Sequence, residues 1–235
     1  MNKLQDRRTR VKICGLRDVE TIRAMNGLPL DEIGFLFAKS RREVSPQLAG
    51  ELIREVHKLR TPAGSRPHTV GVFVDTQLEI LRELLKVAPL DVVQLHGDES
   101  PELCAAIREE LGVEVWKVFS VTESEQLSDD SHSKKLAEGP LRLDRYQGTL
   151  DAVLIDTAGG GTGQAFAWHV IQRYAEAAAR IGVPLYVAGG LHPDNVGELL
   201  ENYTPSGVDV SSGVETEGIK DIDKIRRFVE RVNQA

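Results

Sequence analysis

The feature that most constrains the fold of this chain is a repeated alternation of short apolar segments with longer amphipathic ones. Short apolar runs are typical of strands, and apolar residues at three- and four-residue spacing are typical of helices. The pattern predicts strands at residues 10–14, 33–37, 69–74, 92–95, 115–118, 153–155, 185–188 and 207–210. It predicts helices at residues 18–26, 46–59, 77–87, 101–111, 168–180, 193–200 and 221–232. Residues 120–150 break the pattern, and we expect one helix and then a variable surface loop there.

About eight strand–helix units follow one another in a chain of 235 residues. Strands that alternate with helices form a parallel sheet, and about eight such units close into a (β/α)8 TIM barrel with the helices outside. This α/β barrel is the predicted fold, and a doubly wound open sheet is the alternative. Barrels of this length are commonly one domain. We therefore expect a polar tail at residues 1–9 and a single barrel domain at residues 10–235.

Charge and hydropathy narrow the function classes. The formal net charge is −7, which argues against nonspecific binding to nucleic acid or to an acidic membrane. No apolar run approaches the roughly 20 residues that span a bilayer, and the first ten residues lack the apolar core of a secretory leader. We expect a cytoplasmic protein with neither nucleic-acid nor membrane partners. The two cysteines, Cys14 and Cys104, have no metal-ligand or redox spacing.

Reactive side chains stand at the ends of the predicted strands, which in a parallel barrel is the edge where ligands bind. The apolar run at residues 153–155 ends on Asp156, where strand gives way to a loop with four glycines between residues 159 and 163. Such a loop lets the backbone approach a ligand, or serves only as a flexible connection. The other strand ends carry a thiol, guanidinium groups, an imidazole and carboxylates, at Cys14, residues 39–42, Asp75, His96, Ser120 and Asp209. A purely structural role at this edge of the barrel does not require such reactive side chains. The set therefore predicts an active site.

Strand parity makes one contact predictable. The valines of Val208-Asp209-Val210-Ser211 should pack outward under helices, which turns Asp209 and Ser211 toward the barrel interior. Lys12 shares the interior face of its own strand with Cys14, and the first and last strands of a closed barrel are neighbours. We expect Lys12 to pair with Asp209, because an unpaired buried charge is costly.

The loops after the last two predicted strands are rich in glycine and serine. They contain Gly189, Gly190, Ser211, Ser212 and Gly213. Many barrels bind a phosphate at this position through backbone N–H groups and a short helix N-terminus. The expected ligand is a phosphorylated small molecule, and the alternative is that these are ordinary turns.

Seven motifs, in order along nearly the whole chain, resemble those of the phosphoribosylanthranilate isomerase family. They are Lys12-Ile-Cys-Gly-Leu-Arg-Asp18, Gly71-Val-Phe-Val74, Val93-Gln-Leu-His-Gly97, Leu154-Ile-Asp-Thr157, Gly160-Gly-Thr-Gly163, Ala188-Gly-Gly-Leu191 and Val208-Asp-Val-Ser-Ser-Gly-Val-Glu215. The resemblance implies a (β/α)8 barrel that catalyses a cofactor-free Amadori rearrangement in tryptophan biosynthesis. The substrate would be N-(5-phosphoribosyl)anthranilate and the product 1-(o-carboxyphenylamino)-1-deoxyribulose 5-phosphate.

The resemblance also implies roles for single residues. The general base of the family falls on Cys14 and its general acid on Asp156. Arg42 corresponds to the arginine that is expected to hold the anthranilate carboxylate, and His96 and Asp209 match positions that line the substrate site. Gly160 and Gly161 lie in the glycine-rich motif and are expected to contact substrate.

The chemistry would require an acid that protonates the ring oxygen and a base that removes the C2 proton. A thiolate serves as that base if nearby cations lower its pKa from about 8.5, and Lys12 or Arg42 could do so. Neither a metal nor an organic cofactor is expected. The open alternatives are an isomerase of another phosphosugar and a non-catalytic barrel that binds a phosphorylated ligand. The oligomeric state is expected to be monomer or homodimer.

Overall fold

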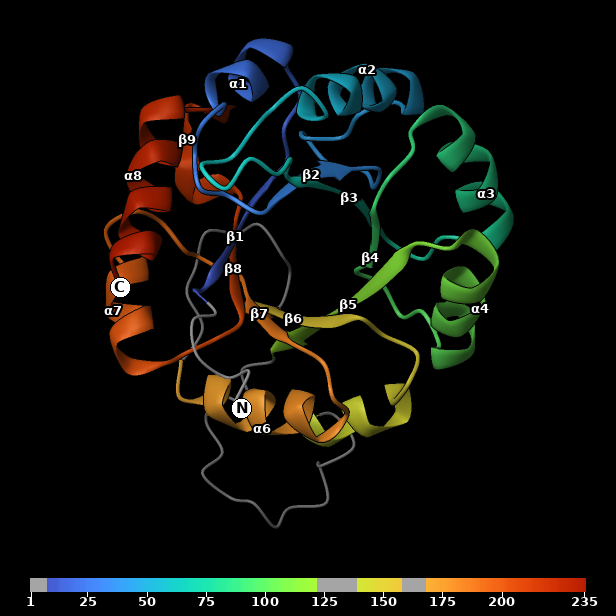
Figure 1. Ribbon diagram of the computed structural model, residues 1–235. Helices are drawn as coiled ribbons and strands as arrows, with labels where there is room; N and C mark the ends of the chain where they lie inside the picture. Colours follow the sequence, from blue (N-terminus) through green and yellow to red (C-terminus); the bar gives the residue numbers. More distant parts are fainter. Residues whose placement is uncertain (1–7, 122–138, 158–167) are drawn as a thin grey trace.

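The computed structural model describes residues 8–121, 139–157 and 168–235. Eight parallel strands form a closed barrel in which each strand pairs with the next and β8 pairs with β1 (Figure 1). The strands are β1 Arg10–Cys14, β2 Glu32–Leu36, β3 His68–Phe73, β4 Val92–Leu95, β5 Glu114–Val121, β6 Ala152–Thr157, β7 Leu185–Val187 and β8 Gly207–Val210. The predicted (β/α)8 barrel is confirmed, and the open-sheet alternative is wrong because the first and last strands are hydrogen-bonded.

Helices surround the barrel and cover its outer surface (Figure 1). They are α1 Val19–Ala24, α2 Pro46–Val56, α3 Leu78–Val87, α4 Pro101–Leu111, α6 Val170–Arg180, α7 Val196–Asn202 and α8 Ile222–Gln234. Local sequence explains where several begin: Ser45 and Ser100 each accept a hydrogen bond from the N–H three residues on, and a proline occupies the first helical position. The helix expected from residue 193 begins only at Val196, because the three residues before it form a turn.

The connection between β5 and β6 differs from the prediction where the structure describes it. Strand β5 continues to Val121, so Ser120 belongs to the strand rather than to a following helix. Residues 122–138 lie outside the described part of the chain. They are followed by a 3-10 helix, η2 (Pro140–Tyr146), which lies beside α6 (Figure 1). Arg142 of η2 donates to the Tyr174 hydroxyl at 2.8 Å and to the Ser120 carbonyl at 2.6 Å.

The apolar core has two layers, as the alternation of side chains along each strand requires. The larger layer lies between the strands and the helices. The smaller one fills the barrel itself and consists of Val70, Val92, Trp116, Val118, Ala152, Leu154, Tyr186 and Ala188. Gly207 makes room for this inner layer, because a Cβ atom there would lie 2.3 Å from the Tyr186 ring. The part of the barrel interior that this inner layer does not fill can hold polar side chains.

The predicted pair at the junction of the first and last strands is confirmed. Lys12 stands in register with Asp209, and the Lys12 Nζ lies 2.9 Å from the Asp209 Oδ2. Burial opposes the charge of Lys12, but Asp209 and Cys14 together outweigh burial and raise the pKa of the lysine. Lys12 is therefore a cation in the barrel interior.

A short hairpin follows β8 and was not predicted. After a single 3-10 turn, η3 (Ser212–Val214), strands β9 (Glu215–Thr216) and β10 (Ile219–Lys220) pair in antiparallel register. The two residues between them, Glu217 and Gly218, have φ angles of 52° and 81°. Positive φ at both central positions is the signature of the tight turns that join two adjacent strands. Among the described residues, no helix is both long and apolar enough to cross a bilayer.

Candidate active site

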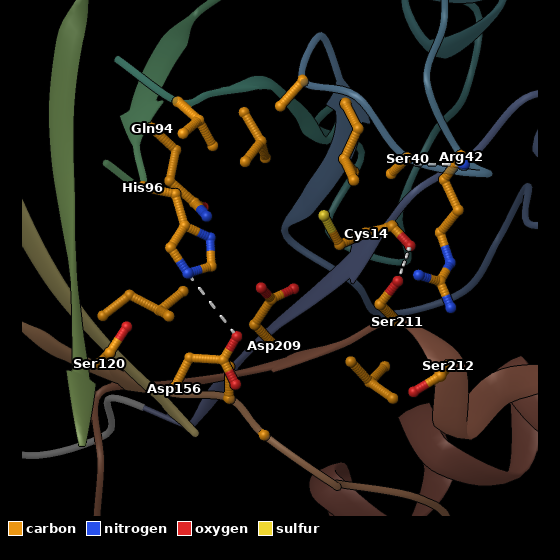
Figure 2. A pocket seen from close by; sticks show the side chains of 18 of the residues that line it. Cys14, Ser40, Arg42, Gln94, His96, Ser120, Asp156, Asp209, Ser211 and Ser212 are labelled. Carbon is orange, nitrogen blue, oxygen red and sulfur yellow. Dashed lines mark hydrogen bonds and ion pairs between the residues drawn. The ribbon is translucent and has the colours of Figure 1, made fainter. Parts of the chain in front are cut away.

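A cavity of about 390 Å³ opens at the C-terminal ends of the barrel strands (Figure 2). Its walls come from the barrel strands other than β7 and from loops that follow the strands, including the loop after β7. Of the predicted site residues, those that line it are Cys14, Arg42, His96, Asp156, Gly189, Gly190, Asp209, Ser211 and Ser212. Gly160 and Gly161 lie outside the described residues. Within the described ranges, no group of three or more His, Cys, Asp or Glu could hold a metal ion.

Cys14 ends β1 with its side chain turned into the cavity (Figure 2). Its neighbour in register on β2 is Gly34, where a Cβ atom would lie 2.8 Å from the Cys14 Sγ. Only a glycine therefore leaves the thiol its present position. Sequence reasoning missed Gly34, and the signal that could have found it is a glycine between two bulky residues in a predicted strand.

The nearby cations do not lower the pKa of the Cys14 thiol below its ordinary value. Burial raises the pKa of Cys14, and the cations Lys12 and Lys220 only partly oppose it, while the negative charge of Asp209 adds to the rise. Arg42, the other cation considered, is not among the main causes of the shift, and Lys220 was not foreseen. The physical reason is depth: Cys14 is only 5% exposed, so loss of hydration of the thiolate outweighs attraction to the lysines.

Asp156 is the next-to-last residue of β6, whose strand continues one residue beyond it. It stands in register with Ser120 of β5 and is 7% exposed. The His96 Nε2 lies 3.9 Å from the Asp156 Oδ2, on the same side of the cavity (Figure 2). Burial, followed by the charges of Lys117 and Lys12, lowers the pKa of His96. The imidazole is therefore neutral near pH 7 and can donate or accept a hydrogen bond.

The loop after β7 has the backbone that its glycines predict. Gly189 and Gly190 have φ angles of 89° and 64°, which side chains with a Cβ rarely adopt. Asn195 fixes this loop, since its amide donates to the Gly190 carbonyl at 3.0 Å and accepts from the His192 N–H at 2.8 Å. The cavity wall here is consequently bare backbone.

The loop after β8 packs tightly against the loop after β7. Gly213 does not line the cavity, but a Cβ atom there would lie 1.9 Å from the Leu191 carbonyl oxygen. The Ser211 hydroxyl donates to the Cys14 carbonyl at 3.2 Å, which ties the same loop to the end of β1 (Figure 2). Gly213 therefore acts by allowing close approach of the two loops.

Arg42 lies in the cavity wall and is held by an acidic residue. Its Nε and Nη2 donate to the two oxygens of Glu215 at 2.6 and 3.0 Å. The side chain of Arg41 is 58% exposed and also donates to Glu215, at 2.7 Å. Gly15 provides the space for Arg42, because a Cβ atom there would lie 2.7 Å from the Arg42 Cδ.

One residue of the strand-end set has a different role from the one that its position indicated. Asp75 does not line the cavity; its carboxylate accepts from the Asp98 N–H at 2.9 Å, and its own N–H donates to Glu99. It therefore organises the loops after β3 and β4. Gln94, which was not singled out, lines the cavity with a buried side-chain oxygen that has no hydrogen-bond partner among the residues that the structure describes.

The fold and the cavity together define an enzyme of the (β/α)8-barrel class, with its reactive groups at the C-terminal rim of the barrel. The model of the N-(5'phosphoribosyl)anthranilate (PRA) isomerase family matches residues 11–231. The chain belongs to this family, which confirms the resemblance seen in the sequence motifs.

Individual relatives agree with the family match. The N-(5'-phosphoribosyl)anthranilate isomerase of Brevibacillus brevis is 42% identical over 95% of this chain and 93% of its own length. That of Bacillus subtilis is 34% identical over 95% of each chain. The crystal structure of the Thermotoga maritima enzyme superposes with a TM-score of 0.74, at 30% identity, over 97% of this chain and all of the other. A further structure, with a TM-score of 0.72 and 30% identity over 97% of this chain and 100% of its own, is a complex with reduced 1-(o-carboxyphenylamino)-1-deoxyribulose 5-phosphate.

Proposed function

We propose that this isomerase converts N-(5-phosphoribosyl)anthranilate to 1-(o-carboxyphenylamino)-1-deoxyribulose 5-phosphate with Cys14 as general base and Asp156 as general acid. The observation that carries the assignment is that both side chains face one cavity, from strands on different sides of the barrel. Asp209 lies between them in the view of Figure 2. A sugar ring bound in this cavity would have an acid and a base on separate sides.

The first step opens the furanose ring. The nitrogen lone pair moves into the C1–N bond, the bond from C1 to the ring oxygen breaks, and the oxygen takes the proton of the Asp156 carboxyl group. The product of this step is an iminium ion with a free hydroxyl on C4. His96, neutral and 3.9 Å from Asp156, is placed to hydrogen-bond to that carboxyl group or to the sugar.

The second step removes the C2 proton, which the adjacent iminium makes acidic. The Cys14 thiolate takes this proton, and the electron pair of the C2–H bond neutralises the iminium to give an enol amine. Return of the enol to the ketone completes the rearrangement. Because burial raises the pKa of Cys14, the two lysines that oppose this rise, Lys12 and Lys220, support formation of the thiolate.

The two charged groups of the substrate would be held by different residues of the cavity. Backbone N–H groups of Gly189 and Gly190 and the hydroxyls of Ser211 and Ser212 suit the phosphate. Arg42 suits the anthranilate carboxylate, since a guanidinium offers paired donors to a carboxylate. Asp209 suits a sugar hydroxyl.

Gly160, Gly161 and Gly213 complete the proposed binding set. The first two belong to it through the sequence motif alone. Gly213 belongs to it because it lets the loops after β7 and β8 come together. A cytoplasmic location remains a prediction, as does the choice between monomer and homodimer.

The test is a turnover assay with freshly generated phosphoribosylanthranilate, followed by the loss of anthranilate-type fluorescence. Cys14→Ala and Asp156→Asn are compared with the wild type, without added metal or cofactor. Each substitution should lower kcat by at least about a hundredfold, because general acid–base groups contribute on that order. Cys104→Ala is the matched control and should keep full rate, since Cys104 is buried away from the cavity. Full activity of Cys14→Ala would refute the base assignment.

A further inference from the structure

We infer that Glu215 is a positioning residue for Arg42, and that Lys220 holds Glu215 in place for this purpose. Glu215 fixes which edge of the Arg42 guanidinium faces the cavity. The inference rests on the proposed function, because it assigns Arg42 to the carboxylate of the substrate. Neither Glu215 nor Lys220 lines the cavity, so both act through Arg42, which does.

The geometry of the Arg42–Glu215 contact determines what remains of the guanidinium. A guanidinium has five N–H donors in a fixed plane. Glu215 takes the side edge, with one bond from Nε and one from Nη2. The end edge, made by Nη1 and the second Nη2 hydrogen, makes no hydrogen bond to the described residues. A substrate carboxylate can bind this end edge through two parallel hydrogen bonds, in the plane that Glu215 imposes.

Burial makes this contact more than a surface ion pair. The side chains of Arg42 and Glu215 are 9% and 4% exposed. Exposed pairs contribute little and reorient easily, whereas breaking a buried pair leaves an uncompensated charge. The carboxylate of Glu215 is firmly ionised: burial alone would raise its pKa, but hydrogen bonds from Arg42 and Lys220 outweigh burial and lower it.

The hairpin after β8 is built to bring Glu215 and Lys220 together. Lys220 stands directly opposite Glu215 in the β9–β10 register, and its Nζ lies 2.9 Å from the Glu215 Oε1. The same Nζ donates to the Ser211 carbonyl at 2.7 Å. The Lys220 side chain is 3% exposed. Lys220 thus links the group that orients Arg42 to the loop proposed to bind phosphate.

The charges around Glu215 favour a second anion nearby. Its single carboxylate is bound by three cations, Arg41, Arg42 and Lys220. One negative charge cannot neutralise three positive ones, so the cluster keeps an excess of positive charge at the cavity wall. The anthranilate carboxylate would supply part of the missing negative charge at Arg42. Glu215 therefore aligns Arg42 and also reduces the repulsion among the three cations.

The test uses two substrates that differ only in the carboxylate: N-(5-phosphoribosyl)anthranilate and N-(5-phosphoribosyl)aniline. Each variant is compared with the wild type on the same substrate, so that differences in intrinsic reactivity cancel. Glu215→Gln should raise KM for the anthranilate substrate at least tenfold and change KM for the aniline analogue less than twofold. Arg42→Ala should show the same selective loss, and the product analogue reduced 1-(o-carboxyphenylamino)-1-deoxyribulose 5-phosphate should bind both variants at least tenfold more weakly.

Matched variants separate positioning from general damage. Glu217→Gln removes the same charge from the exposed turn of the same hairpin and should match the wild type on both substrates. Glu215→Asp keeps the charge on a shorter side chain and should give a smaller selective loss, and it also serves if Glu215→Gln does not fold. An equal loss on both substrates, or none, for the Glu215 variants would overturn the inference. A wild type that does not turn over the anthranilate substrate, or an Arg42→Ala that keeps its KM, would instead overturn the proposed function.

Discussion

Cys14 and Gly34 face each other across the first two strands of the barrel, so close that the thiol occupies the space where any other residue at position 34 would carry its Cβ atom. The position of the proposed base is therefore set by the absence of a side chain on the neighbouring strand. Glycine weakens a strand interior, and here that cost is offset by the room it leaves for a reacting group.

Gly34→Ala is expected to displace Cys14 and impair turnover without preventing folding. The new Cβ would lie 2.8 Å from the Sγ, which forces the thiol out of its position. Displacement of a catalytic group by about 1 Å can lower the rate on the order of a hundredfold. We expect kcat to fall tenfold or more while the melting temperature changes by only a few degrees. Gly197→Ala, at a position with nothing within 4 Å of the added carbon, is the control and should keep full activity.

Asp209→Asn is expected to destabilise the protein through Lys12. The substitution leaves the fully buried ammonium of Lys12 without its anionic partner. Loss of one partner of a buried pair costs about 3–5 kcal/mol in the free energy of unfolding. Urea unfolding followed by circular dichroism measures this change. Asp144→Asn breaks a pair with Arg180 in which both side chains are about half exposed, and it should cost about 1 kcal/mol or less. Equal effects of the two substitutions would contradict the prediction.

The reactivity of Cys14 toward iodoacetamide should increase with pH through a midpoint above the ordinary thiol value of about 8.5. Burial raises the pKa of Cys14, so the reactive thiolate forms later than it does in an exposed cysteine. Lys220→Met removes a cation that opposes this rise and should move the midpoint to still higher pH. Cys104 does not interfere, since it is fully buried and its pKa is raised to about 12. A midpoint below 8.5 in the ligand-free enzyme would contradict this account.

The raised pKa of Glu32 predicts that the folded protein loses stability as the pH rises. Burial, only partly opposed by Arg10, raises the pKa of Glu32 from 4.5 to about 8 in the folded protein. The folded state thus binds a proton more tightly than the unfolded state, and the resulting stabilisation is complete below pH 4.5 and lost as the pH rises through 8. Each unit of pKa difference corresponds to about 1.4 kcal/mol, so the total is a few kcal/mol at most.

Glu32→Gln should remove this pH dependence, because the amide cannot titrate and its oxygen can still accept the Tyr186 hydroxyl. The measurement is the free energy of unfolding between pH 5 and pH 9. Glu83→Gln, in which an exposed carboxylate is replaced, should leave the wild-type slope unchanged. If the wild type and Glu32→Gln have parallel curves, Glu32 is ionised throughout and the prediction is wrong.

Most of the correct predictions come from two patterns in the sequence, the periodicity of apolar residues and the alternation of side chains along each strand. The bounds of β1, β4, β8 and α4 agree with those expected from the sequence, because polar residues, glycine or proline mark their ends. The Lys12–Asp209 pair followed from alternation together with closure of the barrel, since two interior charges on neighbouring strands have few other partners. The motifs then identified the family.

Features that leave no periodic pattern or motif in the sequence were not predictable. Strands β9 and β10 have two residues each, too few for any periodic signal, so the role of Lys220 could not be inferred. The direction of the Cys14 pKa depends on how deeply the thiol is buried, which residue types do not reveal. The extension of β5 to Val121 reflects pairing with β6 rather than a local preference of the polar Ser120.

The junction of β1 and β8 has a consequence for biosynthesis of the protein. Lys12 and Asp209, like Cys14 and Ser211, are separated by 197 positions in the sequence. A ribosome that has translated the first seven strands has already made the thiol, together with Lys12 and Gly34, but not yet Asp209, Ser211 or Lys220. Cys14 therefore emerges with only part of its final environment, and the rest arrives when the last strand closes the ring.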